Sequence, residues 1–229
     1  MIIREFCAEN FTEIPAAVAA GANRIELCDN LAVGGTTPSL GVMRVATRFA
    51  QSAQTPLLVM IRPRGGGFVY DDVELEIMGN DILAAAEFGV DGVVLGALTV
   101  DGWIDEAAMK WLMGICQTAT RSGTDAMVGP QRLDVTFHMA YDHVRAPRQF
   151  EALDLLIELG VDRVLTHGSP DRRPIADNME HVRRIVEYAG GRIGVVVGGG
   201  VTSENLAEVV AATGAIEVHG TRIVATRPG

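Results

Sequence analysis

The sequence is short of cysteine and of basic residues, and it lacks a long apolar run. Its three cysteines, an odd number in a chain of 229 residues, argue against a disulfide scaffold and favour a reducing compartment. Its 29 acidic residues outnumber the 19 basic ones, and the net charge of -10 disfavours binding to nucleic acid or to a membrane surface. No stretch has the uninterrupted apolar length of a spanning helix, and no signal-like segment precedes the first strand-like run. We therefore expect a cytoplasmic protein.

The chain also lacks a G-x-G-x-x-G pattern after its first strand-like run, which argues against a doubly wound dinucleotide-binding sheet. Strand-like and helix-like runs instead alternate along the sequence. The expected strands cover 2–7, 24–28, 57–62, 92–95, 133–138, 163–166, 193–197 and 216–219. The expected helices cover 14–20, 40–50, 75–88, 106–120, 150–159, 178–188 and 203–212. Eight strands joined by helices predict an α/β fold, a TIM-like (β/α)8 barrel, with residues 1–229 as a single domain.

The end of this expected barrel is incomplete. Residues 220–229 follow the last expected strand, and Pro228-Gly229 is not helix-forming, so we expect the eighth outer helix to be absent or vestigial. The outward residues of the first and last strands, Val218 among them, should then be exposed. Exposed apolar surface of this kind usually marks a partner interface, so we expect a homodimer that forms there. A second irregular segment, 121–131, is expected to be a loop without a catalytic role.

Polar or reactive residues repeatedly occur two positions apart near the ends of the expected strands. Side chains two apart on a strand lie on the same face, so each pair points into one shared interior or toward one shared rim. The pairs are Glu5 and Cys7, Glu26 and Cys28, Arg62 and Arg64, Thr136 and His138, and Glu217 and His219. Because (β/α)8 barrels carry their active sites at the C-terminal ends of the strands, we expect a site there. The alternative is a buried ion network that satisfies itself.

Cys7 and Cys28 end neighbouring strands, so their sulfurs can approach one ion. Two thiolates suit Cu(I), whereas a structural zinc site needs four ligands. We therefore expect Cys7 and Cys28 to form a copper(I) site. The alternative is that both are small buried hydrophobic residues. Cys116 lies in an expected helix and is assigned to packing.

Three carboxylates, Glu5, Glu26 and Glu217, come together when the last strand pairs with the first. Arg62 and Arg64 on the third strand could neutralise them. A carboxylate left unpaired beside its neighbours would have a raised pKa, which suits it to general acid or base chemistry near neutral pH. A purely structural network of Glu and Arg is the alternative.

His138 and His219 each lie at a strand end, where proton transfer or metal binding is expected of histidine. If the chain is an enzyme, the expected catalytic residues are therefore Glu26, Arg62, His138 and His219. His167, which follows another strand, is a further candidate.

A glycine-rich loop, Gly198-Gly199-Gly200, follows the seventh expected strand. Glycine lets backbone N–H groups face a ligand, and the loops after strands seven and eight of such barrels frequently hold a phosphate. The expected cofactor-binding or anion-binding residues are Arg64, Thr166, His167, Gly199, Gly200 and Arg222. The segment 65–71 begins with glycines and carries aromatic residues, so it could act as a lid.

With these segments in view, the chain resembles the CutC copper homeostasis family over nearly all of its length. The likeness is carried by Arg24-Ile25-Glu26-Leu27-Cys28, Gly34-Gly35-Thr36-Thr37-Pro38-Ser39, Ile61-Arg62-Pro63-Arg64-Gly65-Gly66, Val135-Thr136-Phe137-His138, Val164-Leu165-Thr166 and Gly198-Gly199-Gly200. The resemblance implies a TIM-like barrel, a cytoplasmic location, self-association and copper binding by Cys7 and Cys28.

The chain departs from the usual pattern of that family in three places. Met139 and Tyr141 stand where Arg and Phe are usual, His167 replaces a usual Ser, and the usual C-terminal extension is missing. Two functions are therefore carried forward. The first is a cytosolic copper homeostasis protein that binds Cu(I) through its cysteine pair. The alternative is an enzyme that acts by acid/base chemistry on a small anionic or phosphorylated metabolite.

Overall fold

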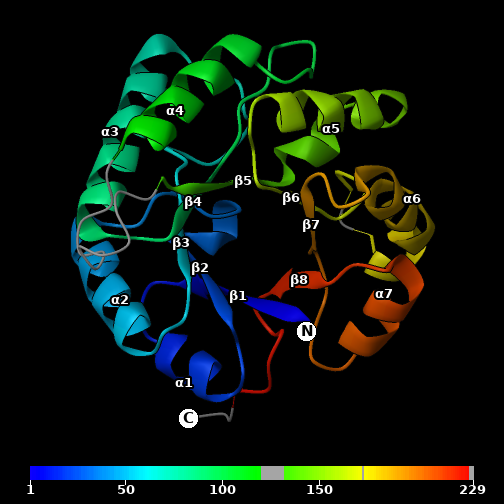
Figure 1. Ribbon diagram of the computed structural model, residues 1–229, viewed down its shortest axis with the longest axis horizontal. Helices are drawn as coiled ribbons and strands as arrows, with labels where there is room; N and C mark the ends of the chain where they lie inside the picture. The colour runs from blue at the N-terminus through cyan, green and yellow to red at the C-terminus, as the bar shows by residue number, and fades with distance from the viewer. Residues whose placement is uncertain (120–131, 172, 227–229) are drawn as a thin grey trace.

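The structure, a computed structural model, describes residues 1–119, 132–171 and 173–226. Eight parallel strands form a closed barrel in sequence order, with β8 pairing back to β1 (Figure 1). The strands are β1 (Ile3–Glu9), β2 (Arg24–Cys28), β3 (Leu57–Met60), β4 (Gly92–Leu95), β5 (Asp134–Phe137), β6 (Arg163–Thr166), β7 (Gly194–Val197) and β8 (Glu217–Gly220). The predicted (β/α)8 barrel is confirmed. The loop expected at 121–131 lies outside the described residues.

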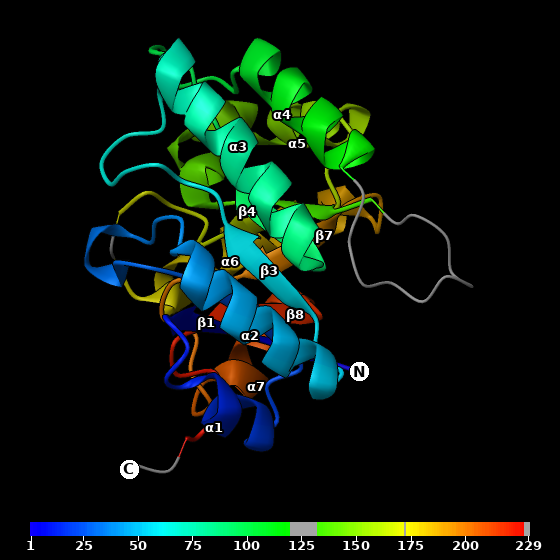
Figure 2. The same ribbon diagram turned by 90° about the vertical axis from the view of Figure 1, so that its left-hand side faces the viewer.

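Helices surround the barrel, and α2 and α3 flank β3 on its outer side (Figure 2). The α-helices in the described ranges are α1 (Ile14–Ala19), α2 (Leu40–Ser52), α3 (Asp72–Phe88), α4 (Glu106–Thr118), α5 (Gln149–Glu158), α6 (Met179–Ala189) and α7 (Leu206–Thr213). Short 3-10 helices cover η1 (Leu31–Val33), η2 (Met139–His143), η3 (Ala146–Arg148) and η4 (Ile175–Asn178). Within the described residues, no helix is both long and apolar enough to cross a membrane.

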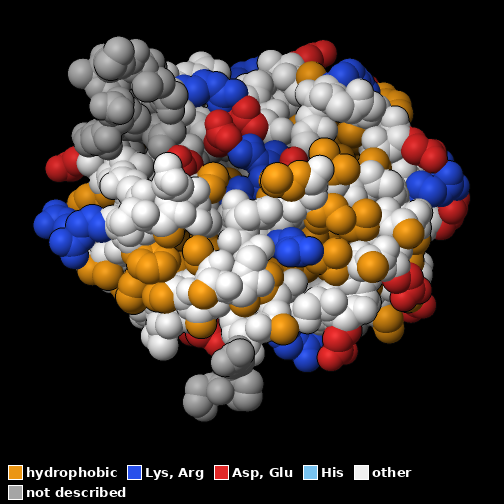
Figure 3. All heavy atoms as spheres, turned by 60° about the horizontal axis from the view of Figure 1, so that its bottom comes forward, with side chains coloured by type: hydrophobic (Ala, Val, Ile, Leu, Met, Phe, Trp, Pro, Cys, Tyr) orange, Lys and Arg blue, Asp and Glu red, His pale blue; other side chains and the backbone are white. Residues whose placement is uncertain are grey.

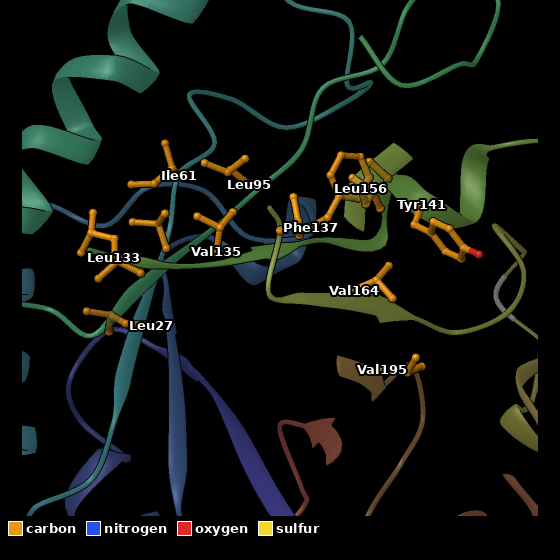
Figure 4. Close-up of a cluster of buried hydrophobic side chains, with 14 of the residues drawn as sticks. Leu27, Ile61, Leu95, Leu133, Val135, Phe137, Tyr141, Leu156, Val164 and Val195 are labelled. Atoms are coloured by element: carbon orange, nitrogen blue, oxygen red, sulfur yellow. The ribbon is translucent and has the colours of Figure 1, made fainter. Parts of the chain in front are cut away.

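Alternation along the strands divides the core into two regions. Outward strand residues pack with the helices into one large apolar cluster, part of which is drawn in Figure 4, including Leu27, Val135, Phe137 and Val164. The apolar cluster on the inner side is much smaller and consists of Cys7, Cys28, Leu58, Met60 and Val94. Much of the remaining barrel interior is polar. A polar interior is costly to bury, so these residues are the natural place to look for a site.

The barrel wall beside β1 and β8 is covered, although no helix follows β8 in the described residues. The segment after β8 runs along the side of the barrel near α1 (Figure 1), and its Ile223 and Val224 are buried. Phe6 and Val218, which point outward from β1 and β8, are buried as well. The predicted exposure of these strands is therefore wrong, because six residues of irregular chain, 221–226, take the place of a helix.

The surface on this side is mixed. Figure 3 shows hydrophobic side chains in several groups that are separated by polar side chains and backbone. Ile216, just before β8, is 64% exposed. The exposed apolar surface at this face is thus smaller than the sequence suggested, which weakens the reason to expect a dimer there. The homodimer stays a prediction.

Candidate functional site

The first part of the site is built from inward positions of β1, β2 and β8. The strand register sets Cys7 beside Glu26 and Glu5 beside His219. Cys28 lies two residues beyond Glu26, so it shares the same face of β2. All five side chains are buried inside the barrel. The spacing of two allowed a shared interior or a shared rim, and the structure places these five groups in the interior.

Glu26 lies at the centre of this cluster. Its Oε1 atom is 3.6 Å from the Cys7 sulfur and 3.3 Å from the Cys28 sulfur. The Nε2 atom of His219 is 3.9 Å from the same oxygen, and its Nδ1 atom is 2.8 Å from Glu5 Oε1. The second Glu26 oxygen, Oε2, is buried and has no hydrogen-bond partner among the described residues. The ligand atoms of Cys7, Glu26 and His219 all lie within 4.8 Å of one another, which is compact enough for one metal ion.

Burial and close contacts shift the pKa values in this cluster in different directions. Burial raises the pKa of Glu26 to about 8. The hydrogen bond with the Cys28 thiol, aided by the nearby His219, lowers the pKa of Cys7 to about 5 against the effect of burial. The pKa of Cys28 rises well above its usual value because of Cys7 and burial. Burial opposes protonation of His219, but Glu26 and Cys7 outweigh it and raise the pKa of its ring.

At neutral pH these shifts favour the thiolate form of Cys7 and the protonated forms of Cys28 and Glu26. A thiolate with a second sulfur next to it is a soft donor set. The cluster therefore fits a soft monovalent metal better than a hard cation.

A network of ion pairs lies beside the cluster in the barrel interior. Arg24 contacts both Glu5 and Glu217, the latter at 2.6 Å. Arg163 reaches Asp134 at 2.5 Å and Glu217 at 3.7 Å. Although burial alone would raise the pKa of Glu5, Arg24 and His219 lower it to about 2. In this part of the barrel, the alternative of a structural network of glutamate and arginine side chains describes what is found.

Arg62 and Arg64 do not neutralise the three glutamates, so that expectation is wrong. The arginines that pair with Glu5 and Glu217 come from inward positions of β2 and β6. Arg62 and Arg64 instead follow the end of β3, where a proline directs the chain into a loop. Glu26 forms no pair with an arginine among the described residues, in agreement with the expectation that one carboxylate is left over with a raised pKa.

The second part of the site is a cavity of about 890 Å³ at the C-terminal ends of the strands. Loop residues from several strands line it, among them Arg62, Phe68, Asp142, His167, Gly199 and Gly200. The lining does not include Cys7, Cys28, Glu26 or His219. The two parts of the site are therefore distinct, one buried in the barrel interior and the other open at its rim.

His138 follows β5 and is buried under the loop that carries Phe68, with the two ring centroids 4.8 Å apart. Its Nδ1 atom accepts a hydrogen bond from the backbone N–H of Ala140 at 3.2 Å. Burial and the nearby Arg62 lower the pKa of His138 to about 3, so the ring is neutral at neutral pH and carries its proton on Nε2. This Nε2 atom has no hydrogen-bond partner in the described ranges.

The expected ligand-binding residues lie in the rim cavity or at the surface, except Thr166, which is buried and bonded to Asp142. His167, Gly199 and Gly200 line the cavity, whereas Arg64 and Arg222 do not. Arg64 pairs with Glu74 on α3. The backbone of Arg222 bonds to the loop at Thr202 and Ser203, and its side chain is exposed.

Asp142 was not singled out from the sequence, although it lines the cavity. It accepts hydrogen bonds from the Thr166 hydroxyl at 2.5 Å, from the His167 backbone at 2.8 Å and from the Gly168 backbone at 3.1 Å. Burial raises the pKa of Asp142 to about 6. The sequence shows an acidic residue four positions after His138, which could have suggested Asp142 as a site residue. The short helix η2 turns Asp142 toward β6, and the sequence pattern does not predict this helix.

The fold and the site define a (β/α)8 barrel with a buried cluster of two thiols, a carboxyl and an imidazole. The CutC family model matches residues 2–224, and the chain belongs to the CutC family. A CutC family protein of Enterococcus faecalis is 49% identical to this chain, over 97% of this chain and all of its own length. The human copper homeostasis protein cutC homolog is 43% identical over 95% of this chain and 72% of its own length.

A solved structure agrees with this assignment. The crystal structure of the putative copper homeostasis protein CutC from Streptococcus agalactiae has a TM-score of 0.90 and 46% sequence identity to this chain. The match covers 98% of this chain and all of that chain.

Proposed function

We propose that this chain acts in copper homeostasis by binding Cu(I) through Cys7 and Cys28. The observation that carries the proposal is the position of both sulfurs next to a single carboxyl oxygen, Glu26 Oε1, in the barrel interior. Two sulfur ligands suffice for soft Cu(I), which does not need the four ligands of structural zinc. The family membership and the name of the human relative support the same assignment.

Features around the cysteines also support the proposal. The low pKa of Cys7 supplies a thiolate at neutral pH. The buried Glu26 Oε2 atom has no hydrogen-bond partner among the described residues, so it could accept a bond from a bound ligand or water beside the two sulfurs. Cys7, Cys28 and Cys116 are all free, which fits a reducing cytoplasm.

The test is a Cu(I) competition titration against a chromophoric chelator under reducing conditions. We expect the wild-type chain to bind one Cu(I), and the Cys7→Ser and Cys28→Ser variants to lose it. Cys116→Ser is the matched control, because Cys116 is also a buried free thiol but lies on α4. Unchanged stoichiometry in the Cys7 and Cys28 variants, with folding verified by circular dichroism, would eliminate the site.

A further inference from the structure

The rim cavity has no part in the proposed copper site, yet it is large and contains a buried cation. Arg62 lines it and is only 3% exposed. No carboxylate among the described residues forms an ion pair with Arg62. A buried charge without a counter-charge is costly, so it is normally retained only where something neutralises it. The guanidinium is thus the first sign of an anionic ligand.

The hydrogen bonds of Arg62 hold it in place without using all of its donors. Its Nη1 atom donates to the carbonyl oxygens of Val33 at 3.0 Å and Gly35 at 2.8 Å, and its Nη2 atom donates to Gly66 O at 2.6 Å. A guanidinium has five N–H groups, so two are not taken by these carbonyl oxygens. The Nε atom has no hydrogen-bond partner in the described part of the chain, and the buried Tyr70 hydroxyl lies beside the guanidinium, which acts to lower the pKa of that hydroxyl. Phe68 packs against the group at 5.0 Å. The N–H groups of a fixed guanidinium that no carbonyl oxygen accepts match the oxygens of a carboxylate or phosphate.

The acidic side chains of the cavity are engaged elsewhere. Asp142 accepts its three hydrogen bonds from residues 166–168 at the end of β6. Asp171 pairs with Arg173 at 2.6 Å. Neither acid contacts Arg62 within the described structure. The cation therefore remains available to a ligand.

The opposite wall of the cavity offers backbone donors. Gly199 and Gly200 follow β7, which lies across the barrel from β3 (Figure 1). Both have positive φ angles, 75° and 97°, and their N–H groups have no hydrogen-bond partner among the described residues. A Cβ atom at position 199 would lie 2.5 Å from Nδ1 of His167, so only glycine fits there. Successive free amides in such a turn form a concave anion-binding surface.

Covalent capture of a carbonyl by lysine is excluded as an alternative use of the cavity. Lys110 is the single lysine of the sequence, and it lies on α4 paired with Glu106 at 3.2 Å. Arginine and backbone amides bind oxyanions reversibly and leave the ligand intact.

We propose that the rim cavity binds a small metabolite with two oxyanionic groups, phosphate or carboxylate, one on Arg62 and the other on the amides of Gly199 and Gly200. This site is separate from the copper site and does not depend on it. The probe is phosphoglycolate, which carries one phosphate and one carboxylate. Inorganic phosphate and acetate each supply one of the two groups.

The first experiment uses the wild-type chain in reductant and a metal chelator, followed by ¹H–¹⁵N NMR. Phosphoglycolate should cause saturable shifts at the Gly199 and Gly200 amides and at the Arg62 Nε–H, and it should bind more tightly than phosphate or acetate. If phosphate matches phosphoglycolate, one wall alone binds and the two-group proposal fails. Shifts only at exposed arginines, or shifts that do not saturate, would overturn the proposal as a whole.

A variant pair separates the cavity from general charge effects. Arg62→Gln should weaken phosphoglycolate binding about tenfold or more, because it removes charge-assisted hydrogen bonds. Arg222→Gln is the matched control, since its side chain is exposed and outside the cavity. Cys7→Ser should bind phosphoglycolate as the wild type does. Equal losses in the Arg62 and Arg222 variants would contradict the assignment, and a loss in Cys7→Ser would contradict its independence from copper.

Discussion

At the scale of single residues, the site depends on how three inward-facing glutamates differ. Glu5 and Glu217 face arginines, whereas Glu26 faces the sulfurs of Cys7 and Cys28. With its pKa near 8, Glu26 remains protonated at neutral pH and does not repel the adjacent thiolate. The same residue type therefore serves as an ion-pair partner on one strand and as a neutral neighbour of the two cysteines on another.

The neutral state of His138 has a consequence for stability in acid. Its pKa is about 3 in the folded chain, against an ordinary value of 6.5, so between these values the unfolded chain binds a proton that the folded chain does not. Stability should therefore fall as the pH is lowered through this window, with a contribution of about 1.4 kcal/mol per pH unit. His138→Gln should flatten this slope when the free energy of unfolding is measured in urea from pH 6.5 to pH 4.

His181→Gln serves as the comparison for that measurement. His181 is only partly buried, and its pKa is also lowered by burial. It should flatten the slope less than His138→Gln does, because much of its ring stays in water. An unchanged slope in His138→Gln would show that the His138 ring is protonated in the folded chain at these pH values.

The sequence predicted the face that the two cysteines share more fully than it predicted the polar partners. Period-two alternation fixes which face Cys7 and Cys28 occupy, and the pairing of β1 with β2 follows from chain order. Which arginine meets which glutamate depends on strand stagger and loop paths instead. For this reason the sequence assigned Arg62 to the glutamates, although three carbonyl oxygens hold it at the rim.

At the scale of elements, the predicted strands at 24–28, 92–95 and 163–166 have the bounds found in the structure. Departures occur where side chains bond to the backbone. The third strand was expected to reach residue 62 but ends at Met60, and the backbone N–H of Arg62 instead donates to the Thr37 hydroxyl at 2.9 Å. The seventh helix was expected from residue 203 but begins at Leu206, because Asn205 accepts from the Thr202 backbone at 2.8 Å. Hydrophobic periodicity carries no information on such local bonds.

Helix α3 begins at Asp72, three residues earlier than expected, because Asp71 and Glu74 form a capping box. The Asp71 carboxylate accepts from the Glu74 backbone N–H at 2.8 Å. Asp71→Ala should therefore lower the free energy of unfolding by about 1 kcal/mol. Asp72→Ala is the matched control, since Asp72 is an exposed neighbour that does not cap the helix. Equal losses in the two variants in chemical denaturation would show that the cap contributes nothing specific.

At the scale of the whole molecule, the irregular segment 221–226 follows β8 within the described residues, where helices follow the other strands. Its Ile223 is 1% exposed, whereas Ile216, just before β8, is 64% exposed. Ile223→Ala should cost about 3 kcal/mol of unfolding free energy, because it removes buried methyl groups and leaves a cavity. Ile216→Ala should change it by less than about 0.5 kcal/mol. If both variants melt like the wild type, the segment does not seal the barrel.

The predicted homodimer is tested by sedimentation equilibrium at micromolar concentration. Dimerisation through the side that carries β8 and α7 should give twice the mass of one chain. Ala207→Glu, a charge at an exposed position on α7, should then shift the equilibrium toward monomer, because a buried unpaired charge is costly at an interface. A monomeric wild type would refute the homodimer, and a dimer indifferent to this charge would place the contact elsewhere.

The central claim is that Cys7 and Cys28 hold Cu(I) together in the barrel interior. X-ray absorption at the copper edge, measured on the chain loaded with one equivalent of Cu(I) under reducing conditions, tests it most directly. We predict scattering from two sulfur neighbours, retained in Cys116→Ser and reduced in both Cys7→Ser and Cys28→Ser. Copper bound only to nitrogen or oxygen, or a spectrum that is the same in all three variants, would contradict the account.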